Sequence, residues 1–262
     1  MDEAALLEAC VLAAREAGAE ILKLVERGFE VETKQDESPV TVCDRAAEHI
    51  ILAALAEAAP AIPIIAEEEV AAGRIPAHGD TYFLVDPLDG TKEFVRGGDD
   101  YTVNIGLIVG GSPRLGVVYQ PACDRLWGGL VGEGAFAEDA SGRRAIRTRE
   151  RSPNLDAVAS KSHLTQSTVD YLREAVGECE HVSIGSSLKF CIVAEGRADI
   201  YPRLSPTSEW DTAAGQCVLE AAGGLVVDPR GRPLRYNQRD TILNGEFMAL
   251  GDTSLPWREW LA

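Results

Sequence analysis

Basic residues are scarce in this chain of 262 residues, which has 25 lysines and arginines against 42 aspartates and glutamates. The formal net charge is therefore −17. A nucleic-acid polymer would be repelled by this charge, so the composition argues against a protein that binds long DNA or RNA. A small anionic substrate is compatible with it only where cations intervene at the site. Metal ions would be the economical source of that positive charge.

Cysteine pairs and long apolar runs are also missing. The six cysteines include no C-x-x-C pair, and several lie in apolar segments, which indicates reduced thiols rather than disulfides or a zinc cluster. No apolar run approaches the length of a transmembrane helix. The acidic, amphipathic N-terminus is unlike a signal peptide. We therefore expect a soluble, cytoplasmic protein, and peripheral association with the inner membrane stays open.

Hydrophobic periodicity predicts a layered α/β architecture, because strand-like and helical segments alternate. Helical spacing is found at 6–25 with a stop at Gly28, from about Asp44 to Leu55, and at 166–176, 186–194 and 210–222. Strand-like runs are found at 31–34, 62–66, 82–85, 101–109, 115–119, 126–130, 134–137, 157–159, 181–184, 199–201, 225–227 and 247–250. The run of strands after residue 100 predicts an antiparallel meander. The polar stretch 138–153 predicts a boundary between an N-terminal half, 1–150, and a C-terminal half, 151–262.

The most informative stretch is Tyr82–Thr91, in which an apolar strand runs into an acidic turn and then into a predicted helix. Asp86 and Asp89 lie three residues apart in that turn. Gly90 has no side chain and lets the backbone pass close to a ligand. The free N–H groups of the following helix start could hold an anion. Two oxygen ligands beside an anion pocket suit Mg²⁺ with a phosphate ester, whereas the alternative is an acidic surface turn.

Two further acidic residues also lie at the boundaries of predicted strands and helices. Glu67 follows an apolar strand, and Asp211 opens a helix. With Asp86 and Asp89 they could line one pocket, which would repel itself unless divalent ions filled it. Two ions would clamp a phosphate and lower the pKa of a bound water. For Glu67 the alternative is a solvated run of three glutamates, and for Asp44 it is a helix N-cap.

Three segments resemble the signatures of the inositol monophosphatase superfamily, in the expected order and over nearly the whole chain. They are Ala66-Glu67-Glu68, Asp86-Pro87-Leu88-Asp89-Gly90-Thr91 and Trp210-Asp211-Thr212-Ala213-Ala214-Gly215. The resemblance implies the αβαβα sandwich of inositol monophosphatases and sugar phosphatases. It also implies an Mg²⁺-dependent enzyme with two to three ions per site.

The resemblance assigns the metal ligands residue by residue. Glu67, Asp86 and the carbonyl of Leu88 would hold one Mg²⁺. Asp86, Asp89 and Asp211 would hold a second. A third, weaker ion would depend on Glu67 through water. The phosphate and substrate would also lie against Glu67, Leu88, Asp89 and Asp211.

The resemblance also assigns the groups that act on the substrate directly. Gly90 and Thr91 would give backbone N–H groups to the phosphate. Thr91 paired with Asp44 would orient the attacking water and help to deprotonate it, so Asp44, Glu67 and Thr91 form the expected catalytic set. None of the cysteines is placed as a covalent nucleophile.

Within the superfamily, four segments are similar to the 3'(2'),5'-bisphosphate nucleotidases of the CysQ type. They are Gly90-Thr91-Lys92-Glu93-Phe94, Ser186-Ser187-Leu188-Lys189-Phe190-Cys191, Tyr201-Pro202-Arg203 and Ser160-Lys161-Ser162-His163, the last with Lys where that group more often has Arg. Lys189 and Arg203 would seat a second phosphate that is not hydrolysed; ordinary surface charges are the alternative. The remaining candidates for substrate contact are Ser160, Ser162, His163 and Ser187. A polar loop residue without a catalytic role is the alternative for His163.

The function implied is Mg²⁺-dependent hydrolysis of adenosine 3',5'-bisphosphate to AMP and phosphate, which belongs to sulfur assimilation. The sulfated analogue is a further candidate substrate. An inositol monophosphatase or a sugar bisphosphatase is the alternative with the same chemistry, and a non-catalytic relative is the third. The expected partner is a small nucleotide bisphosphate and no nucleic-acid polymer, and a homodimer stays open.

Overall fold

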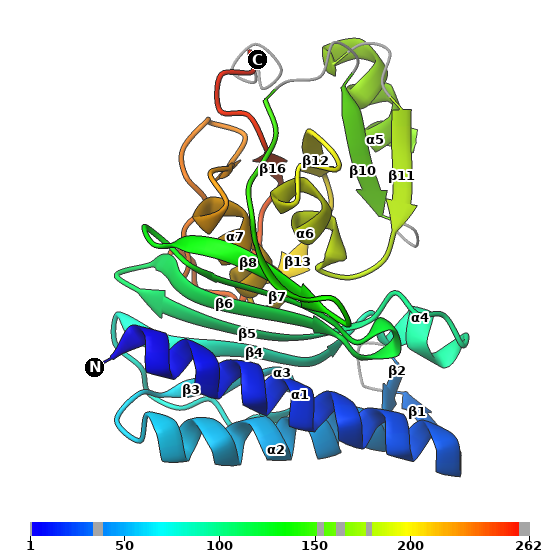
Figure 1. The fold of residues 1–262 in the computed structure, drawn as a ribbon, viewed down its shortest axis with the longest axis vertical. Coiled ribbons are helices and arrows are strands. Elements are labelled where there is room, and N and C mark those ends of the chain that lie inside the picture. The colour runs from blue at the N-terminus through cyan, green and yellow to red at the C-terminus, as the bar shows by residue number, and fades with distance from the viewer. Residues whose placement is uncertain (1, 34–38, 151–154, 161–165, 177–179, 257–262) are drawn as a thin grey trace.

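The structure is a computed structural model, and it describes residues 2–33, 39–150, 155–160, 166–176 and 180–256. Helices and sheets alternate in layers, as Figure 1 shows. Two long helices cover one face of a seven-stranded sheet, and two further helices separate its other face from a five-stranded sheet. A short helix lies beyond that second sheet. The layered α/β fold expected from the sequence is confirmed.

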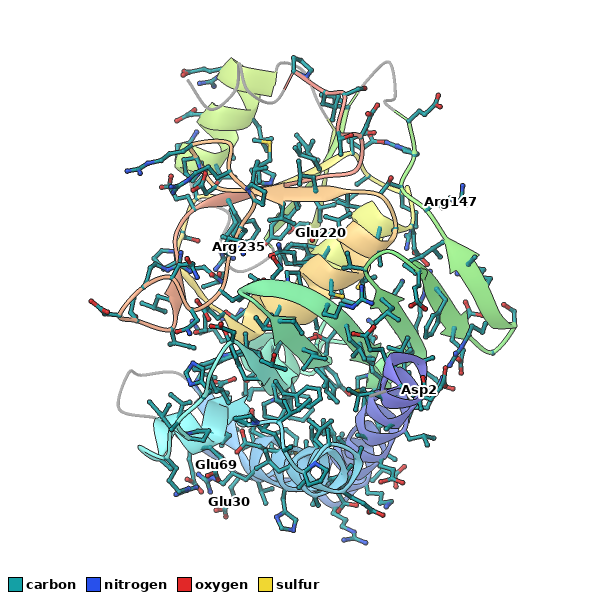
Figure 2. All side chains as sticks on the ribbon, turned by 90° about the vertical axis from the view of Figure 1, so that its left-hand side faces the viewer. Asp2, Glu30, Glu69, Arg147, Glu220 and Arg235 are labelled. Atoms are coloured by element: carbon teal, nitrogen blue, oxygen red, sulfur yellow. The ribbon has the colours of Figure 1, made fainter. Side chains whose placement is uncertain are left out.

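The first layer consists of α1 (Glu3–Arg27) and α2 (Val42–Ala58). Asp2 caps α1 by accepting the N–H groups of Ala4 and Ala5, and Gly28 ends it with a φ of 79°. The expected first helix and its stop are thus confirmed. Figure 2 shows Asp2 at the beginning of α1, and side chains filling the layers on both sides of the sheet.

The second helix begins earlier than the sequence predicted, and Asp44 is not its N-cap. Thr41 is the N-cap, and its hydroxyl accepts the N–H of Cys43 at 3.1 Å. The Asp44 carboxylate accepts the N–H of Thr41 at 2.7 Å, so the two residues form a capping box. The prediction failed because a Thr and an Asp within the same four residues are both good caps, and only the backbone decides between them.

The seven-stranded sheet has the order β3-β4-β5-β6-β7-β8-β9, with β3 parallel to β4 and every other pair antiparallel. Its strands are β3 (Ile64–Ala66), β4 (Thr81–Asp89), β5 (Thr102–Val109), β6 (Ser112–Gln120), β7 (Arg125–Leu130), β8 (Gly134–Asp139) and β9 (Gly142–Ile146). The predicted meander is confirmed. Strand β9 was not predicted, because only Ile146 of its five residues is buried and it has no apolar alternation.

Short elements connect these strands: α3 (Glu67–Ala71), α4 (Thr91–Val95) and a 3₁₀ turn at Pro121–Cys123. Before α2, β1 (Val31–Thr33) pairs with β2 (Pro39–Thr41).

The five-stranded sheet has the order β11-β10-β12-β16-β14 and is mixed. Its strands are β10 (Asp156–Ser160), β11 (Glu180–Ile184), β12 (Ile200–Arg203), β14 (Leu225–Val227) and β16 (Phe247–Leu250). The accompanying helices are α5 (Gln166–Tyr171) with a π-helical turn at Leu172–Val176, α6 (Leu188–Ala194) and α7 (Trp210–Ala221). Two short strands that were not predicted, β13 (Thr207–Ser208) and β15 (Leu243–Asn244), pair with each other.

A row of three glycines lets α7 lie close against the first sheet. Gly106 on β5 pairs with Gly116 on β6, which pairs with Gly129 on β7. A Cβ atom on Gly116 would lie 2.5 Å from the carbonyl oxygen of Ala214, and one on Gly129 would lie 2.9 Å from Cβ of Ala221. We call these three residues the glycine row. It sets the distance between the sheet and α7.

The first sheet ends at Ile146 and the second begins at Asp156. Helix α7 from the C-terminal half nevertheless packs on β4 to β8 of the first sheet. The division of the chain at residue 150 therefore stays a prediction. Among the described helices, none combines the length and the apolar character that a membrane span requires.

Candidate active site

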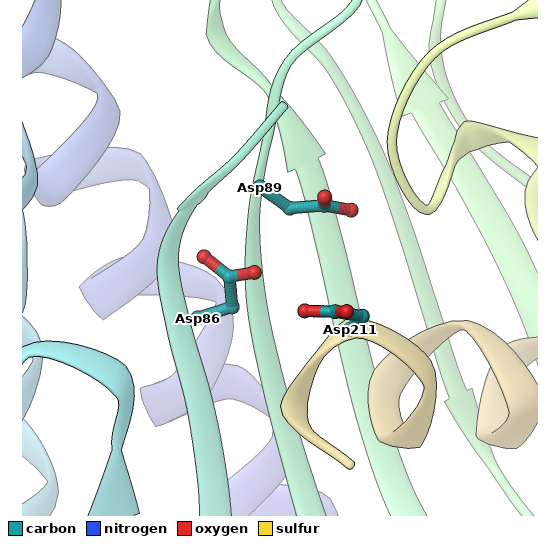
Figure 3. A group of neighbouring side chains, drawn as sticks. All are labelled: Asp86, Asp89 and Asp211. Carbon is teal, nitrogen blue, oxygen red and sulfur yellow. The ribbon is translucent and has the colours of Figure 1, made fainter. Parts of the chain in front are cut away.

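Three aspartates from two parts of the chain converge where β4 ends and α7 begins. Carboxylate oxygens of Asp86, Asp89 and Asp211 all lie within 4.8 Å of one another, and Figure 3 shows the three side chains pointing toward a common centre. Asp86 and Asp89 reach the same side because the register of β4 against β5 shifts between them. Asp211 lies in the first turn of α7. We call these residues the aspartate cluster.

Main-chain groups hold two members of the cluster in place. Asp86 Oδ1 accepts the N–H of Leu88 at 3.0 Å, across the proline turn. Asp211 Oδ2 accepts the N–H of Ser208 at 2.8 Å. Each bond engages one oxygen of its carboxylate and fixes the direction of the other.

The electrostatics of the cluster favour a cation. Burial, together with the charges of Glu67, Asp89 and Asp211, raises the pKa of Asp86 well above its ordinary value. Burial, together with Asp89 and Glu67, raises the pKa of Asp211 to about 8. Burial also raises the pKa of Asp89, although the nearby Lys189 opposes the shift. Carboxylates that are this hard to ionise together are a suitable ligand set for a divalent metal.

Glu67 stands at the edge of the same site. It is the first residue of α3, directly after β3, and it lines the pocket with Asp89 and Asp211. The three glutamates of the run thus make different contacts. Glu69 pairs with Arg74, and the N–H of Glu68 is bound by the buried carboxylate of Glu48 at 2.8 Å. The interpretation of the run as a uniformly solvated surface therefore fails for Glu67.

The predicted pair of Thr91 and Asp44 is brought together by α4 and α2. The Thr91 hydroxyl lies 3.3 Å from Asp44 Oδ1 and 3.0 Å from the carbonyl oxygen of Leu88. Asp44 Oδ2 accepts both the N–H and the hydroxyl of Thr41, each at 2.7 Å. Burial raises the pKa of Asp44. The Asp44 side chain therefore takes part in the capping box of α2 and is also the hydrogen-bond partner of Thr91.

Gly90 allows the sharp turn between the cluster and Thr91. Its φ is 91°, a left-handed conformation that favours glycine, and a Cβ atom there would lie 2.8 Å from the carbonyl oxygen of Asp100. Both reasons for a glycine follow from the geometry of the turn.

The pocket has a volume of about 170 Å³, and two cations, Lys189 and Arg203, are among its lining residues. Lys189 on α6 is buried, donates to the carbonyl oxygen of Ser186 and lies 5.4 Å from the centre of the Tyr201 ring. Burial lowers the pKa of Lys189 to about 8. Arg203 on β12 donates to the carbonyl oxygens of Ser205 at 3.1 Å and Pro206 at 3.2 Å. Neither residue is an ordinary surface charge, so that alternative is wrong.

Ser187 is one of the residues expected to contact substrate, which stays a prediction, and in the structure it contacts the aspartate cluster. Its N–H and its hydroxyl lie 2.6 Å and 2.9 Å from Asp89 Oδ2, and its neighbour Ser186 contributes to the pocket lining instead. Ser186 has a φ of 48°, uncommon for a residue with a side chain. Its hydroxyl, like that of the pocket residue Thr207, is buried and has no hydrogen-bond partner among the described residues. The sequence offered no signal for Thr207, and for Ser186 only its position beside Ser187.

The other three residues expected to contact substrate are not placed in the pocket by the structure. Ser160 ends β10, and its side chain lies outside the described part of the chain. Ser162 and His163 also lie outside the described residues, so their roles stay predictions.

Comparison with known proteins identifies relatives over nearly the whole chain. A sequence model described as the inositol monophosphatase family matches residues 2–253. The chain is 44% identical over 244 residues to the 3'(2'),5'-bisphosphate nucleotidase CysQ of Salmonella typhimurium, covering 92% of this chain and 98% of the relative. The corresponding protein of Escherichia coli K12 is 43% identical over 242 residues, with coverages of 92% and 97%.

Solved structures show the same likeness. The crystal structure of CysQ from Bacteroides thetaiotaomicron is 35% identical, with a TM-score of 0.78 over 94% of this chain and 96% of that one. An IMPase from Thermotoga maritima is 25% identical, with a TM-score of 0.81 over 100% of this chain and 96% of that one.

Proposed function

Because this chain belongs to the inositol monophosphatase family, we propose that it is a metal-dependent 3'(2'),5'-bisphosphate nucleotidase. Its substrate would be adenosine 3',5'-bisphosphate and its products AMP and phosphate. One observation carries the proposal: a single pocket is lined both by Asp89 and Asp211 and by the buried cations Lys189 and Arg203. A substrate with two phosphates fits such a pocket, because metal ions held by the carboxylates could bind the reacting phosphate and the two cations the retained one.

The family is metal-dependent, and the aspartate cluster suits a hard divalent ion because its members raise one another's pKa values. We propose Mg²⁺ as that ion. Glu67, Asp86 and the carbonyl of Leu88 would hold one ion, the aspartate cluster a second, and Glu67 a weaker third through water. Bound ions would neutralise the carboxylates and stabilise negative charge on the reacting phosphate.

The chain's own residues would manage the proton of the attacking water. The hydroxyl of Thr91 lies within 3.3 Å of Asp44 Oδ1, so a proton taken up by Thr91 could pass to the Asp44 carboxylate. The raised pKa of Asp44 supports this role, because a carboxylate that is easier to protonate is a better acceptor at neutral pH. Glu67 completes the proposed catalytic set by holding the ion beside that water.

The substrate would be bound along the pocket from the phosphate to the nucleoside. The backbone N–H groups of Gly90 and Thr91 would bind the reacting phosphate, and Lys189 and Arg203 the retained one. The hydroxyls of Ser186 and Thr207 support a polar ligand, because a buried hydroxyl without a partner is costly until a ligand supplies one. Ser160, Ser162 and His163 are proposed to contact the sugar or base.

We base the proposed metabolic role on the substrate and the proposed cellular location on the free cysteines. Adenosine 3',5'-bisphosphate is the by-product of sulfate activation and sulfo-transfer, so its removal would relieve product inhibition. Five cysteines of the described residues are free, which supports a reducing, cytoplasmic location. The net charge of −17 supports a small-molecule partner rather than a nucleic-acid polymer.

The test is phosphate release with Mg²⁺ from three substrates in parallel: adenosine 3',5'-bisphosphate, inositol 1-phosphate and fructose 1,6-bisphosphate. We expect the highest kcat/KM for the nucleotide and no release when EDTA removes the metal. A preference for inositol or sugar phosphate would keep the chemistry and overturn the substrate. Release that persists in EDTA would overturn the metal dependence.

A further inference from the structure

We propose that Ser187 is a positioning residue, not a substrate contact: it joins the aspartate cluster to the segment that carries the substrate-binding cation Lys189. The inference rests on the proposed function and deepens it. Three donors converge on Asp89 Oδ2: the Ser187 N–H at 2.6 Å, the Ser187 hydroxyl at 2.9 Å and the Asn104 side-chain amide at 3.4 Å. They occupy that oxygen, so Oδ1 is the atom of Asp89 left to face a metal ion.

Ser187 also contacts a second member of the cluster. Its hydroxyl lies 2.8 Å from the carbonyl oxygen of Asp211, and it accepts the amide N–H of Asn104 at 2.9 Å. A serine hydroxyl has one hydrogen, so it donates either to Asp89 or to Asp211 at a given moment. One small side chain thus fixes β4, β5 and α7 relative to one another, at the point where two of the three carboxylates leave the backbone.

The same residue stands directly before α6, and this makes it a link as well as a support. Ser186 precedes it and Lys189 follows two residues later, and both line the pocket. The Lys189 ammonium donates to the carbonyl of Ser186. A shift of Asp89 would therefore be passed through Ser187 to Lys189.

The two roles of Ser187 predict opposite results for Ser187→Ala. A positioning residue is needed for metal binding even without substrate, whereas a substrate contact is not. We therefore expect the Mg²⁺ affinity of the substrate-free protein, measured by titration calorimetry, to fall about 10-fold, the lower end for loss of a group that orients a metal ligand. The remaining N–H of Ser187 limits the loss. At saturating Mg²⁺, KM for adenosine 3',5'-bisphosphate should change less than about 2-fold, a difference below that of a lost hydrogen bond.

Ser141→Ala is the matched control, because Ser141 also donates a hydroxyl to an aspartate, Asp139, but at an exposed turn. It should leave Mg²⁺ affinity and KM unchanged. Unaltered Mg²⁺ affinity in Ser187→Ala with a raised KM would overturn the inference in favour of a substrate contact. If Ser187→Ala does not fold, Asn104→Ala removes the other donor, and unaltered Mg²⁺ affinity there would likewise overturn it.

Failure of the proposed function has a separate signature. In that case the wild-type protein would not hydrolyse the nucleotide, while the calorimetric difference between Ser187→Ala and wild type would persist. A wild-type enzyme that is active on the nucleotide, with equal Mg²⁺ affinities in the two proteins, would overturn the role of Ser187 alone.

Discussion

Replacing Asp89 by asparagine removes one charge from the aspartate cluster at nearly constant side-chain size. We expect Asp89→Asn to lose at least about 100-fold in kcat, because loss of a direct metal ligand should cost no less than loss of a group that orients one. Its unfolding temperature in EDTA should be equal or higher, since a repelled carboxylate has been removed. The exposed Asp240→Asn is the matched control. Near-normal turnover with Mg²⁺ would contradict the role of Asp89.

The proposed role of Lys189 leads to a prediction that depends on the substrate. Lys189→Met should raise KM for adenosine 3',5'-bisphosphate about 10-fold or more, the cost of one charged hydrogen bond. For adenosine 3'-phosphate, which has no second phosphate, the change should be small. Lys23→Met, an exposed lysine paired with Glu20, controls for a general loss of positive charge. Equal effects on both substrates would place Lys189 outside the seat of the second phosphate.

The roles of single residues were predicted well where they depend on short spacing along the sequence. They were predicted poorly where they depend on the direction in which a side chain points. Asp86 and Asp89, three residues apart on a turn, could be assigned to one site from the sequence. The contact of Ser187 with Asp89 and the position of Ser186 in the pocket lining could not, because both follow from the positive φ of Ser186. That backbone angle turns the Ser187 hydroxyl toward the aspartate cluster and leaves Ser186 at the pocket wall.

At the scale of elements, the position of Asp211 depends on how closely α7 approaches the sheet. In Gly116→Ala the new Cβ atom would lie 2.5 Å from a main-chain oxygen of α7, so the helix must move. We expect a loss of about 1–3 kcal/mol in the free energy of unfolding, as for an overpacked core. Mg²⁺ affinity should also fall, because Asp211 moves with the helix.

A control variant separates this packing effect from a general cost of alanine. Gly79→Ala adds a Cβ atom that meets nothing within 4 Å, and it should leave stability and Mg²⁺ affinity near the wild-type values. If Gly116→Ala proves equally neutral, α7 does not depend on the glycine row for its position.

The elements themselves were predicted from periodicity wherever one face is buried. Strand β9 escaped because it is a polar edge strand with one buried residue, and the two-residue strands β13 and β15 are too short for any period. The glycine row was visible only as scattered glycines. Its meaning requires the register of three strands, which the sequence does not contain.

At the scale of the whole molecule, the pKa shifts predict how stability without metal depends on pH. The folded pKa of Asp211 is about 8 and that of Glu48 about 7, whereas free Asp and Glu titrate near 4. Both folded values are raised, so the stability they confer is complete below about pH 4 and is lost as pH rises through 7 and 8. In EDTA the unfolding temperature should fall between pH 6 and 8.5.

Mg²⁺ should reduce this fall, because the ion replaces the protons that otherwise relieve the repulsion. Asp211→Asn should flatten the profile in EDTA by removing one of the titrating groups. Scanning calorimetry at a series of pH values measures both effects. An unfolding temperature that rises from pH 6 to 8.5 in EDTA would contradict the assignment of protonated carboxyl groups to the metal-free cluster.

The layered architecture was predicted because the alternation of segments and the three signatures point to the same fold. What the sequence could not show is how the halves depend on each other. Asp86 and Asp89 come from β4, whereas Asp211 comes from a helix more than 100 positions later that rests on the same sheet. That dependence arises from packing between distant segments.

The glycine row also bears on how this protein can vary. Any amino-acid replacement of a glycine adds a side chain, and at Gly106, Gly116 and Gly129 each would press on α7. In a saturation-mutagenesis screen scored by survival, these three positions should tolerate as little replacement as the aspartates, although none of them touches substrate. The active site therefore depends in part on residues that have no catalytic or ligand-binding side chain.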